Sequence, residues 1–197
     1  MSWLNIFLSL VLFTASSLMA QDWPQFLGPN RDGQYQGVSL VQGWGREGPS
    51  ELWRRPVGSG FAGPVVADGR LILFHRLNDH EVVEAWNAVS GEPIWRYDYV
   101  TTYRDDFGFD EGPRAVPVVV DGKVFTFGAQ GHMHAFDLET GDLVWGVDTR
   151  VEFGVRKGFF GSAGSPLIDS GHVIANIGGA GAGVVAFDAD TGEVAWT

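Results

Sequence analysis

The side chains best suited to chemistry are carboxylates crowded into one acidic segment, DDFGFDEG, at residues 105–112. They belong to Asp105, Asp106, Asp110 and Glu111. Carboxylate oxygens are the ligands that hard cations such as calcium prefer. The segment lacks the D-x-[DN]-x-[DN]-G spacing of an EF-hand loop, however, and a solvated acidic loop accounts for the same composition. We therefore predict no metal site here.

Arg114 follows the acidic segment and precedes a predicted strand. The equivalent positions of the neighbouring repeats hold Phe61 and Ala163, so the fold itself does not require a charge there. An arginine in this place can clamp a carboxylate or phosphate of a ligand. We predict Arg114, Asp110 and Glu111 as ligand-binding residues. The alternative is an ion pair between Arg114 and either Asp110 or Glu111.

A histidine pair and a glycine-rich run resemble functional motifs, but neither has the features that its motif requires. His132 and His134 alternate along a predicted strand, so they point to one face. No third ligand accompanies them, as a zinc or copper site would need, and we expect them at the polar end of a hairpin. The glycine-rich run GGAGAG at 178–183 is not followed by a helix, which excludes a dinucleotide-binding loop. We can name no catalytic residue.

The N-terminal sequence predicts that the chain is exported. Residues 1–20 carry no charge and combine an apolar stretch with small residues before Gln21, which is typical of a cleaved signal peptide. We expect an exported, periplasmic or extracellular protein without a stable membrane span; the alternative is that the segment is retained as a membrane anchor. The net charge of −11 disfavours nucleic acid and anionic lipid as partners. Because the chain has no cysteine, it has no disulfide and no CxxCH haem attachment site.

An eleven-residue frame recurs around these side chains. Its three copies are AWNAVSGEPIW at 85–95, AFDLETGDLVW at 135–145 and AFDADTGEVAW at 186–196. The Asn or Asp folds its side chain onto the backbone two residues ahead and so starts a turn. The glycine supplies the positive φ that closes the turn. The final tryptophan brings a large apolar face and an N–H group that needs an acceptor.

Before each frame lie two apolar strands joined by Asp-Gly or Asp-Ser-Gly, at 63–74, 116–127 and 165–176. This is a strong hairpin signal. Each unit therefore contains four short antiparallel strands in about fifty residues, the period of a β-propeller blade. We predict an all-β propeller with blades at about 58–100, 112–150 and 161–197. A β-sandwich also strings short strands together, but it gives no reason for the sequence to repeat.

Residues 50–58, SELWRRPVG, resemble the last strand of a blade without its first three strands, after a glycine-rich segment at 21–49. Three blades and one strand cannot close a ring of about four to eight blades. We expect an N-terminal part of a longer propeller; the alternative is a ring of several copies joined through open edges. The residues predicted to dock the blades are Trp53, Trp95, Trp145, Trp196, Gly91, Gly141 and Gly192.

The frame A-x-[DN]-x-x-[ST]-G-x-x-x-W resembles the tryptophan-docking motif of pyrroloquinoline-quinone (PQQ) repeat propellers. The stretches QDWPQFLGPNRDG, YRDDFGFDEGPRAVP and GGAGAGVVAFDADTGEVAW are similar to secreted bacterial members, so the resemblance covers residues 22–197. Some members of this family are quinoprotein dehydrogenases that hold PQQ and calcium in the central funnel. Others, similar to the propeller component of the outer-membrane assembly machinery, bind no cofactor and act as interaction scaffolds.

The resemblance therefore implies two functions. The first is a scaffold that binds a protein, an envelope polymer or a small ligand in its funnel. The alternative is a PQQ-dependent oxidoreductase of the alcohol dehydrogenase type, with PQQ and calcium as cofactors and its catalytic residues beyond Thr197. No family calcium ligand or catalytic Asp matches a position of this chain, and the adjacent-cysteine disulfide of many such dehydrogenases has no counterpart here. We favour the scaffold.

Overall fold

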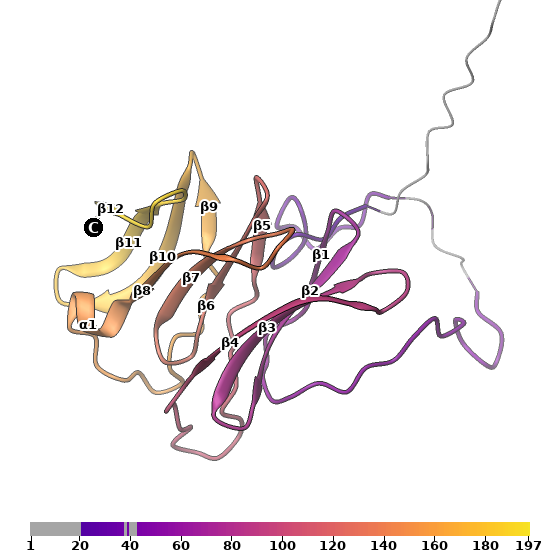
Figure 1. Cartoon of the computed structure of the whole chain (residues 1–197), viewed down its shortest axis with the longest axis horizontal. Helices are drawn as coiled ribbons and strands as arrows, with labels where there is room; N and C mark the ends of the chain where they lie inside the picture. The colour runs from indigo at the N-terminus through magenta and orange to yellow at the C-terminus, as the bar shows by residue number, and fades with distance from the viewer. Residues whose placement is uncertain (1–20, 38, 40–42) are drawn as a thin grey trace, which may run out of the picture.

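The protein folds into three four-stranded antiparallel sheets, described by a computed structural model over residues 21–37, 39 and 43–197 (Figure 1). The predicted signal peptide at 1–20 lies outside the described residues. The predicted all-β fold of four-stranded units is confirmed. The first sheet contains β1 (Val65–Ala67), β2 (Arg70–Leu77), β3 (His80–Asn87) and β4 (Pro93–Val100). The second contains β5 (Val118–Val120), β6 (Lys123–Phe127), β7 (His132–Asp137) and β8 (Leu143–Asp148), and the third β9 (Leu167–Asp169), β10 (His172–Gly179), β11 (Ala182–Asp188) and β12 (Val194–Trp196).

In each sheet the strands follow chain order from one edge to the other, and the three sheets stand side by side. The first strands β1, β5 and β9 approach one another, and they form the inner edge of the assembly (Figure 1). The tight turns that follow them are Asp68-Gly69, Asp121-Gly122 and Ser170-Gly171. Both residues of each turn have positive φ, as a type I′ hairpin turn requires.

The tryptophan that closes each eleven-residue frame packs against the next sheet. The Trp95 indole N–H donates to the Leu138 carbonyl at 2.9 Å, from the first sheet to the second. One sheet later the Trp145 N–H donates to the Ala189 carbonyl at 3.1 Å. These two indoles occupy equivalent positions, so each one fixes a sheet to the turn of its neighbour.

The glycines of the frame make room for these indoles. Gly141 and Gly192 have φ values of 76° and 74°, which favour glycine. A Cβ atom on Gly141 would lie 2.5 Å from the Trp95 ring, and one on Gly192 would lie 2.7 Å from the Trp145 ring. The frame therefore requires glycine both for its backbone conformation and for the close approach of the indole.

The segment at 50–58 makes the same contact without forming a regular strand. Trp53 donates to the Ala88 carbonyl at 3.1 Å, and its ring fills the space in front of Gly91. Among the described residues no strand pairs with residues 50–58, as expected of an outer strand without the rest of its blade, and beyond them Ser59 pairs with β2 at Arg76. Trp196 lies on β12 with 46% of its surface exposed.

The N-terminal segment runs along the inner edge of the sheets. Trp23 exchanges two backbone hydrogen bonds with Val66 of β1, at 2.8 and 3.0 Å. The Val119 N–H of β5 donates to the Pro24 carbonyl at 2.8 Å. Residues 23 and 24 therefore connect two neighbouring first strands. No helix within the described residues has the length and apolar character that crossing a bilayer requires.

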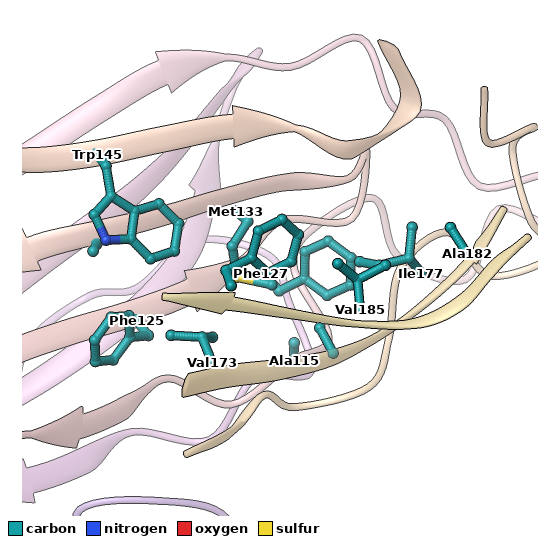
Figure 2. Close-up of a cluster of buried hydrophobic side chains, with 12 residues drawn as sticks. Ala115, Phe125, Phe127, Met133, Trp145, Val173, Ile177, Ala182 and Val185 are labelled. Atoms are coloured by element: carbon teal, nitrogen blue, oxygen red, sulfur yellow. The ribbon is translucent and has the colours of Figure 1, made fainter. Parts of the chain in front are cut away.

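The core lies between adjacent sheets. Figure 2 shows the cluster between the second and third sheets, where Phe125, Phe127 and Met133 face Val173 and Val185. A second cluster joins the first and second sheets in the same way. Because each sheet buries its faces against its neighbours, the loops at the sheet ends carry the accessible polar groups.

One short helix, α1 (Thr149–Phe153), follows β8 and is not predicted from the sequence. The Asp148 side chain caps it by accepting from the backbone N–H groups of Arg150 and Val151. Gly154 ends the helix in the left-handed conformation, with φ of 61°. The segment that follows the helix, residues 155–164, lies at the end of the second and third sheets.

Candidate binding site at the linker end

The two ends of the sheets differ in character. One end carries the tight turns at 68–69, 121–122 and 170–171 and the tryptophan-docking turns, and we call it the turn end. The other carries the hairpins after β2 and β6 and the long linkers 101–117 and 149–166, and we call it the linker end. In Figure 1 the linker end lies at the bottom. Loops at one end of a rigid scaffold are the usual place for binding residues.

The carboxylates of the acidic segment are used within the linker. Asp105 accepts from the Phe109 N–H at 2.7 Å, and Asp110 accepts from the Gly112 N–H at 2.7 Å. Asp106 forms an ion pair with Lys157 of the other linker. These groups fold the loop and join it to its neighbour, and they do not converge on a common point. Within the described residues, no group of three or more His, Asp or Glu side chains is placed to hold a metal ion.

Arg114 holds the base of this loop. Its carboxylate partner is Asp105, with the Nη2 and Oδ1 atoms 3.4 Å apart and the two side chains 9% and 0% exposed. The predicted ion pair with the Asp110 or Glu111 side chain is therefore wrong in its partner. Arg114 also donates to the backbone carbonyls of Asp110 and Gly112, at 2.8 and 3.1 Å. The turn between these residues brings Asp105 closer to the guanidinium than the adjacent acids.

A second arginine, which sequence reasoning missed, ties the linker to the first sheet. Arg76 of β2 is only 4% exposed. Its guanidinium donates to the carbonyls of Asn78, Tyr103 and Glu111, at 2.7, 2.8 and 3.0 Å. Asp79 accepts a further bond from it at 3.2 Å. A charged residue in the second half of a strand, next to buried positions, is the signal that could have indicated this anchor.

The exposed Arg104 pairs with carboxylates that also contact Arg76. Its guanidinium lies 3.0 Å from the Asp79 carboxylate and 3.2 Å from that of Glu111. The Arg104 side chain is 55% exposed, against 3% for Arg76. The two arginines therefore share partners but differ in burial.

A buried polar group joins the first and second sheets. Glu81 of β3 is 0% exposed and accepts from the Tyr99 hydroxyl at 2.7 Å and from the Ala129 N–H at 2.8 Å. Burial raises the pKa of the Glu81 carboxyl, and the hydrogen bonds from Tyr99 and Ala129 act in the opposite direction. Glu81 thereby attaches the first sheet to the loop that forms one wall of the site.

The two histidines of β7 lie on one face, with their rings parallel and 6.0 Å apart. His134 is 8% exposed and packs against Tyr97 and Tyr99 of β4. Its place between two sheets differs from the predicted polar hairpin end, because the tyrosines of β4 cover that face. Burial, and then the charge of His132, lower the pKa of His134 to about 4.

This pKa predicts a loss of stability in acid. Between pH 6.5 and about 4 the unfolded chain takes up a proton at His134 that the folded chain does not, so stability falls as the pH falls. The full loss is about 3 kcal/mol. We expect His134→Phe, which keeps an aromatic ring, to remove this contribution. Urea unfolding at about pH 7 and about pH 4.5 measures it; an equal pH dependence in both proteins would contradict the prediction.

Between the two linkers lies a pocket of about 580 Å³. Its walls come from both linkers, the β6–β7 hairpin and β10. Four of its lining residues are cationic and none carries a carboxylate. The cations are Arg104, Arg150, Arg156 and Lys157. An acidic chain thus lines this pocket with positive side chains.

The walls of the pocket are held by hydrogen bonds between loops. Gln130 of the β6–β7 hairpin accepts from the Thr102 N–H at 2.7 Å and donates to its hydroxyl at 2.8 Å. The Ser162 N–H donates to the Ala129 carbonyl at 2.9 Å. Arg150 is paired with the Asp148 carboxylate at 3.1 Å. Within the described part of the chain Arg156 has no ion pair, which leaves its charge available to a ligand.

Comparison with known proteins identifies the family to which this chain belongs. A PQQ-repeat family model, described as outer membrane protein assembly factor BamB, matches residues 39–197. The chain belongs to this family. The PQQ-repeat chain is 33% identical over 140 residues to the quinohemoprotein alcohol dehydrogenase ADH-IIG of Pseudomonas putida. This alignment covers 68% of this chain and 19% of that relative. It is 33% identical over 141 residues to the dehydrogenase subunit of the quinone alcohol dehydrogenase of Komagataeibacter europaeus.

Solved structures agree on the fold. The quinohemoprotein alcohol dehydrogenase of Comamonas testosteroni superposes with a TM-score of 0.61 at 27% identity, over 92% of this chain and 28% of that one. A europium-containing methanol dehydrogenase superposes with a TM-score of 0.50 at 21% identity. The three sheets are therefore blades of a β-propeller. The PQQ-repeat chain spans about one fifth of the length of the curated relatives it matches.

Proposed function

We propose that this PQQ-repeat protein is an exported propeller that acts as a binding scaffold, and that its linker end receives the partner. The observation that carries the proposal is the pocket between the linkers, with four cationic side chains and no carboxylate among its lining residues. Arg104, Arg150 and Lys157 are paired with carboxylates outside the lining, so within the described residues Arg156 is the charge that favours an anionic ligand group at this place. The proposed location, periplasmic or extracellular, rests on the signal-type sequence at 1–20.

The predicted ligand-binding residues keep a place in this proposal. Asp110 and Glu111 shape the acidic linker, and Arg114 holds its base through Asp105. We propose that they position the linker against the partner. Arg156 is the residue we expect to contact an anionic group directly, since it is exposed and lines the pocket.

The second candidate function is a PQQ-dependent oxidoreductase. It is favoured by the 33% identity to quinohemoprotein alcohol dehydrogenases. PQQ carries carboxylates, and Arg156, which has no ion pair within the described residues, fits their charge. When bound, PQQ would accept the two electrons of an alcohol oxidation. Calcium does not fit the acidic linker, because Asp105, Asp106 and Asp110 are each committed to separate partners.

One experiment separates the two functions. The full-length protein is incubated with PQQ, with and without calcium, and the reduction of an artificial dye is followed as ethanol is added. The scaffold predicts no ethanol-dependent reduction above the protein-free control, whatever PQQ does to the melting temperature. Sustained ethanol-dependent turnover that requires PQQ would overturn the scaffold in favour of the oxidoreductase.

A further inference from the structure

Four exposed phenylalanines gather where the two linkers meet. Phe107 and Phe109 come from the first linker, with 50% and 73% of their surface exposed. Phe159 and Phe160 come from the second, with 60% and 47% exposed. We call these four residues the phenylalanine cluster. Exposed apolar groups scattered singly are ordinary, but a contiguous aromatic group on the surface marks an interaction site.

The rings of the phenylalanine cluster touch across the two linkers. The centroids of Phe107 and Phe159 are 4.4 Å apart, and those of Phe159 and Phe160 are 4.7 Å apart. Phe109 extends the row beyond Phe107, at 6.1 Å. The row is therefore assembled by tertiary contact between segments fifty residues apart. It does not collapse into the core, since every member stays at least 47% exposed.

The phenylalanine cluster borders the cationic pocket. Lys157 and Gly158 line the pocket and lead directly into Phe159. Lys157 also lies over the Tyr103 ring, at 5.6 Å, and pairs with Asp106, the neighbour of Phe107. None of the four phenylalanines lines the pocket itself. A ligand that covers both features must therefore join an apolar or aromatic part to an anionic part.

We propose that the phenylalanine cluster and the pocket together dock an acidic peptide segment that carries aromatic side chains, supplied by a partner protein. This inference rests on the proposed scaffold function and names the chemistry of its partner. The row of four rings is longer than one small aromatic molecule, which favours an extended chain. The cations lie in a recess beside the rings, so carboxylates on a flexible chain reach them better than the flat surface of a bilayer does.

Charge complementarity sets the specificity. An acidic segment is repelled by most of a molecule with a net charge of −11. Within the described residues Arg156 is the cation of the pocket that no carboxylate neutralises, so it is the favoured place for a carboxylate of the segment. The aromatic side chains of the segment stack on the phenylalanine cluster, which gains apolar burial and favourable ring contacts. The phenylalanines thus supply affinity, and Arg156 supplies selection for acidic sequences.

The test uses a short fluorescein-labelled peptide that alternates glutamate and phenylalanine, titrated with the full-length protein and followed by anisotropy. We expect saturable binding that weakens at high salt. Phe107→Ser and Phe159→Ser should each weaken it about tenfold, and Arg156→Glu by a similar factor. Phe26→Ser is the matched control, because Phe26 is exposed to a similar degree (48%) outside the cluster. Each variant must keep the wild-type melting temperature.

Several outcomes would overturn the inference. One is equal binding of the control peptide in which lysine replaces glutamate. Another is unchanged affinity in both serine variants. Neutral phosphatidylcholine vesicles that sediment with the wild type, but not with Phe159→Ser, would indicate a membrane contact in place of a peptide. None of these results depends on dye reduction, so a failure here is distinguishable from a failure of the scaffold function.

Discussion

The Trp145→Ala variant should lose about 3–5 kcal/mol of unfolding free energy, the cost of emptying a large aromatic site. Trp145 is 8% exposed, and its ring lies 6.0 Å from Phe125 of its own sheet and 6.3 Å from Phe187 of the next. Its N–H donates to the Ala189 carbonyl, which would be left without this donor. Removal of the indole therefore loosens the junction between the second and third sheets.

Urea unfolding of the full-length protein, followed by far-ultraviolet circular dichroism, measures this loss. Trp44→Ala is the matched control, since the Trp44 side chain is 59% exposed. We expect the control to change stability by less than about 1 kcal/mol. If both variants lost the same small amount, the indole would not be the element that joins neighbouring sheets.

The second large effect is expected from Arg76→Met. This variant keeps the apolar part of the side chain but leaves the Asn78 and Glu111 carbonyls without their donor, and the Tyr103 carbonyl with Arg104 alone. Because the guanidinium is buried and fully bonded, we expect a loss of about 3–5 kcal/mol. The loss should be accompanied by faster amide hydrogen exchange in linker 101–117, which Arg76 fastens to the first sheet.

Arg104→Met is the control that isolates burial. Arg104 contacts the same Asp79 and Glu111 carboxylates and also donates to the Tyr103 carbonyl at 3.0 Å, but it is largely exposed. Exposed ion pairs contribute about 0–1 kcal/mol, so we expect little change in stability or exchange. A loss in Arg104→Met as large as that in Arg76→Met would show that ion pairing to the two carboxylates, and not the buried bonds to the carbonyls, holds the linker.

The regular part of the fold could be predicted because its signals are local. The Asp-Gly turns and the glycine of the eleven-residue frame need positive φ at fixed positions, and the structure has it there. The repeated tryptophan indicates contact with a neighbouring repeat unit. Helix α1 escaped prediction because it has five residues and depends on the Asp148 cap, which sequence spacing alone does not distinguish from a turn.

The site was harder to predict because its members come together only by tertiary folding. Arg114 was assigned to the acids nearest in sequence, but the turn at 110–112 presents backbone carbonyls to it and brings Asp105 to its side. Arg76 and Glu81 are hidden in strands, where alternation places most charged residues in solvent. The pocket is lined by two linkers and a hairpin that are distant in the sequence, so no single stretch of sequence predicts it.

Position-specific photo-crosslinking tests the central claim, that the linker end receives the partner, most directly. A photoreactive phenylalanine analogue replaces Phe160 at the linker end or Asp121 at the turn end of the full-length protein, and each protein is irradiated in its own cells. We predict a discrete protein adduct from position 160 that the acidic phenylalanine peptide suppresses, and none from position 121. An adduct from position 121 alone, or one at 160 that the peptide leaves unchanged, would contradict the account.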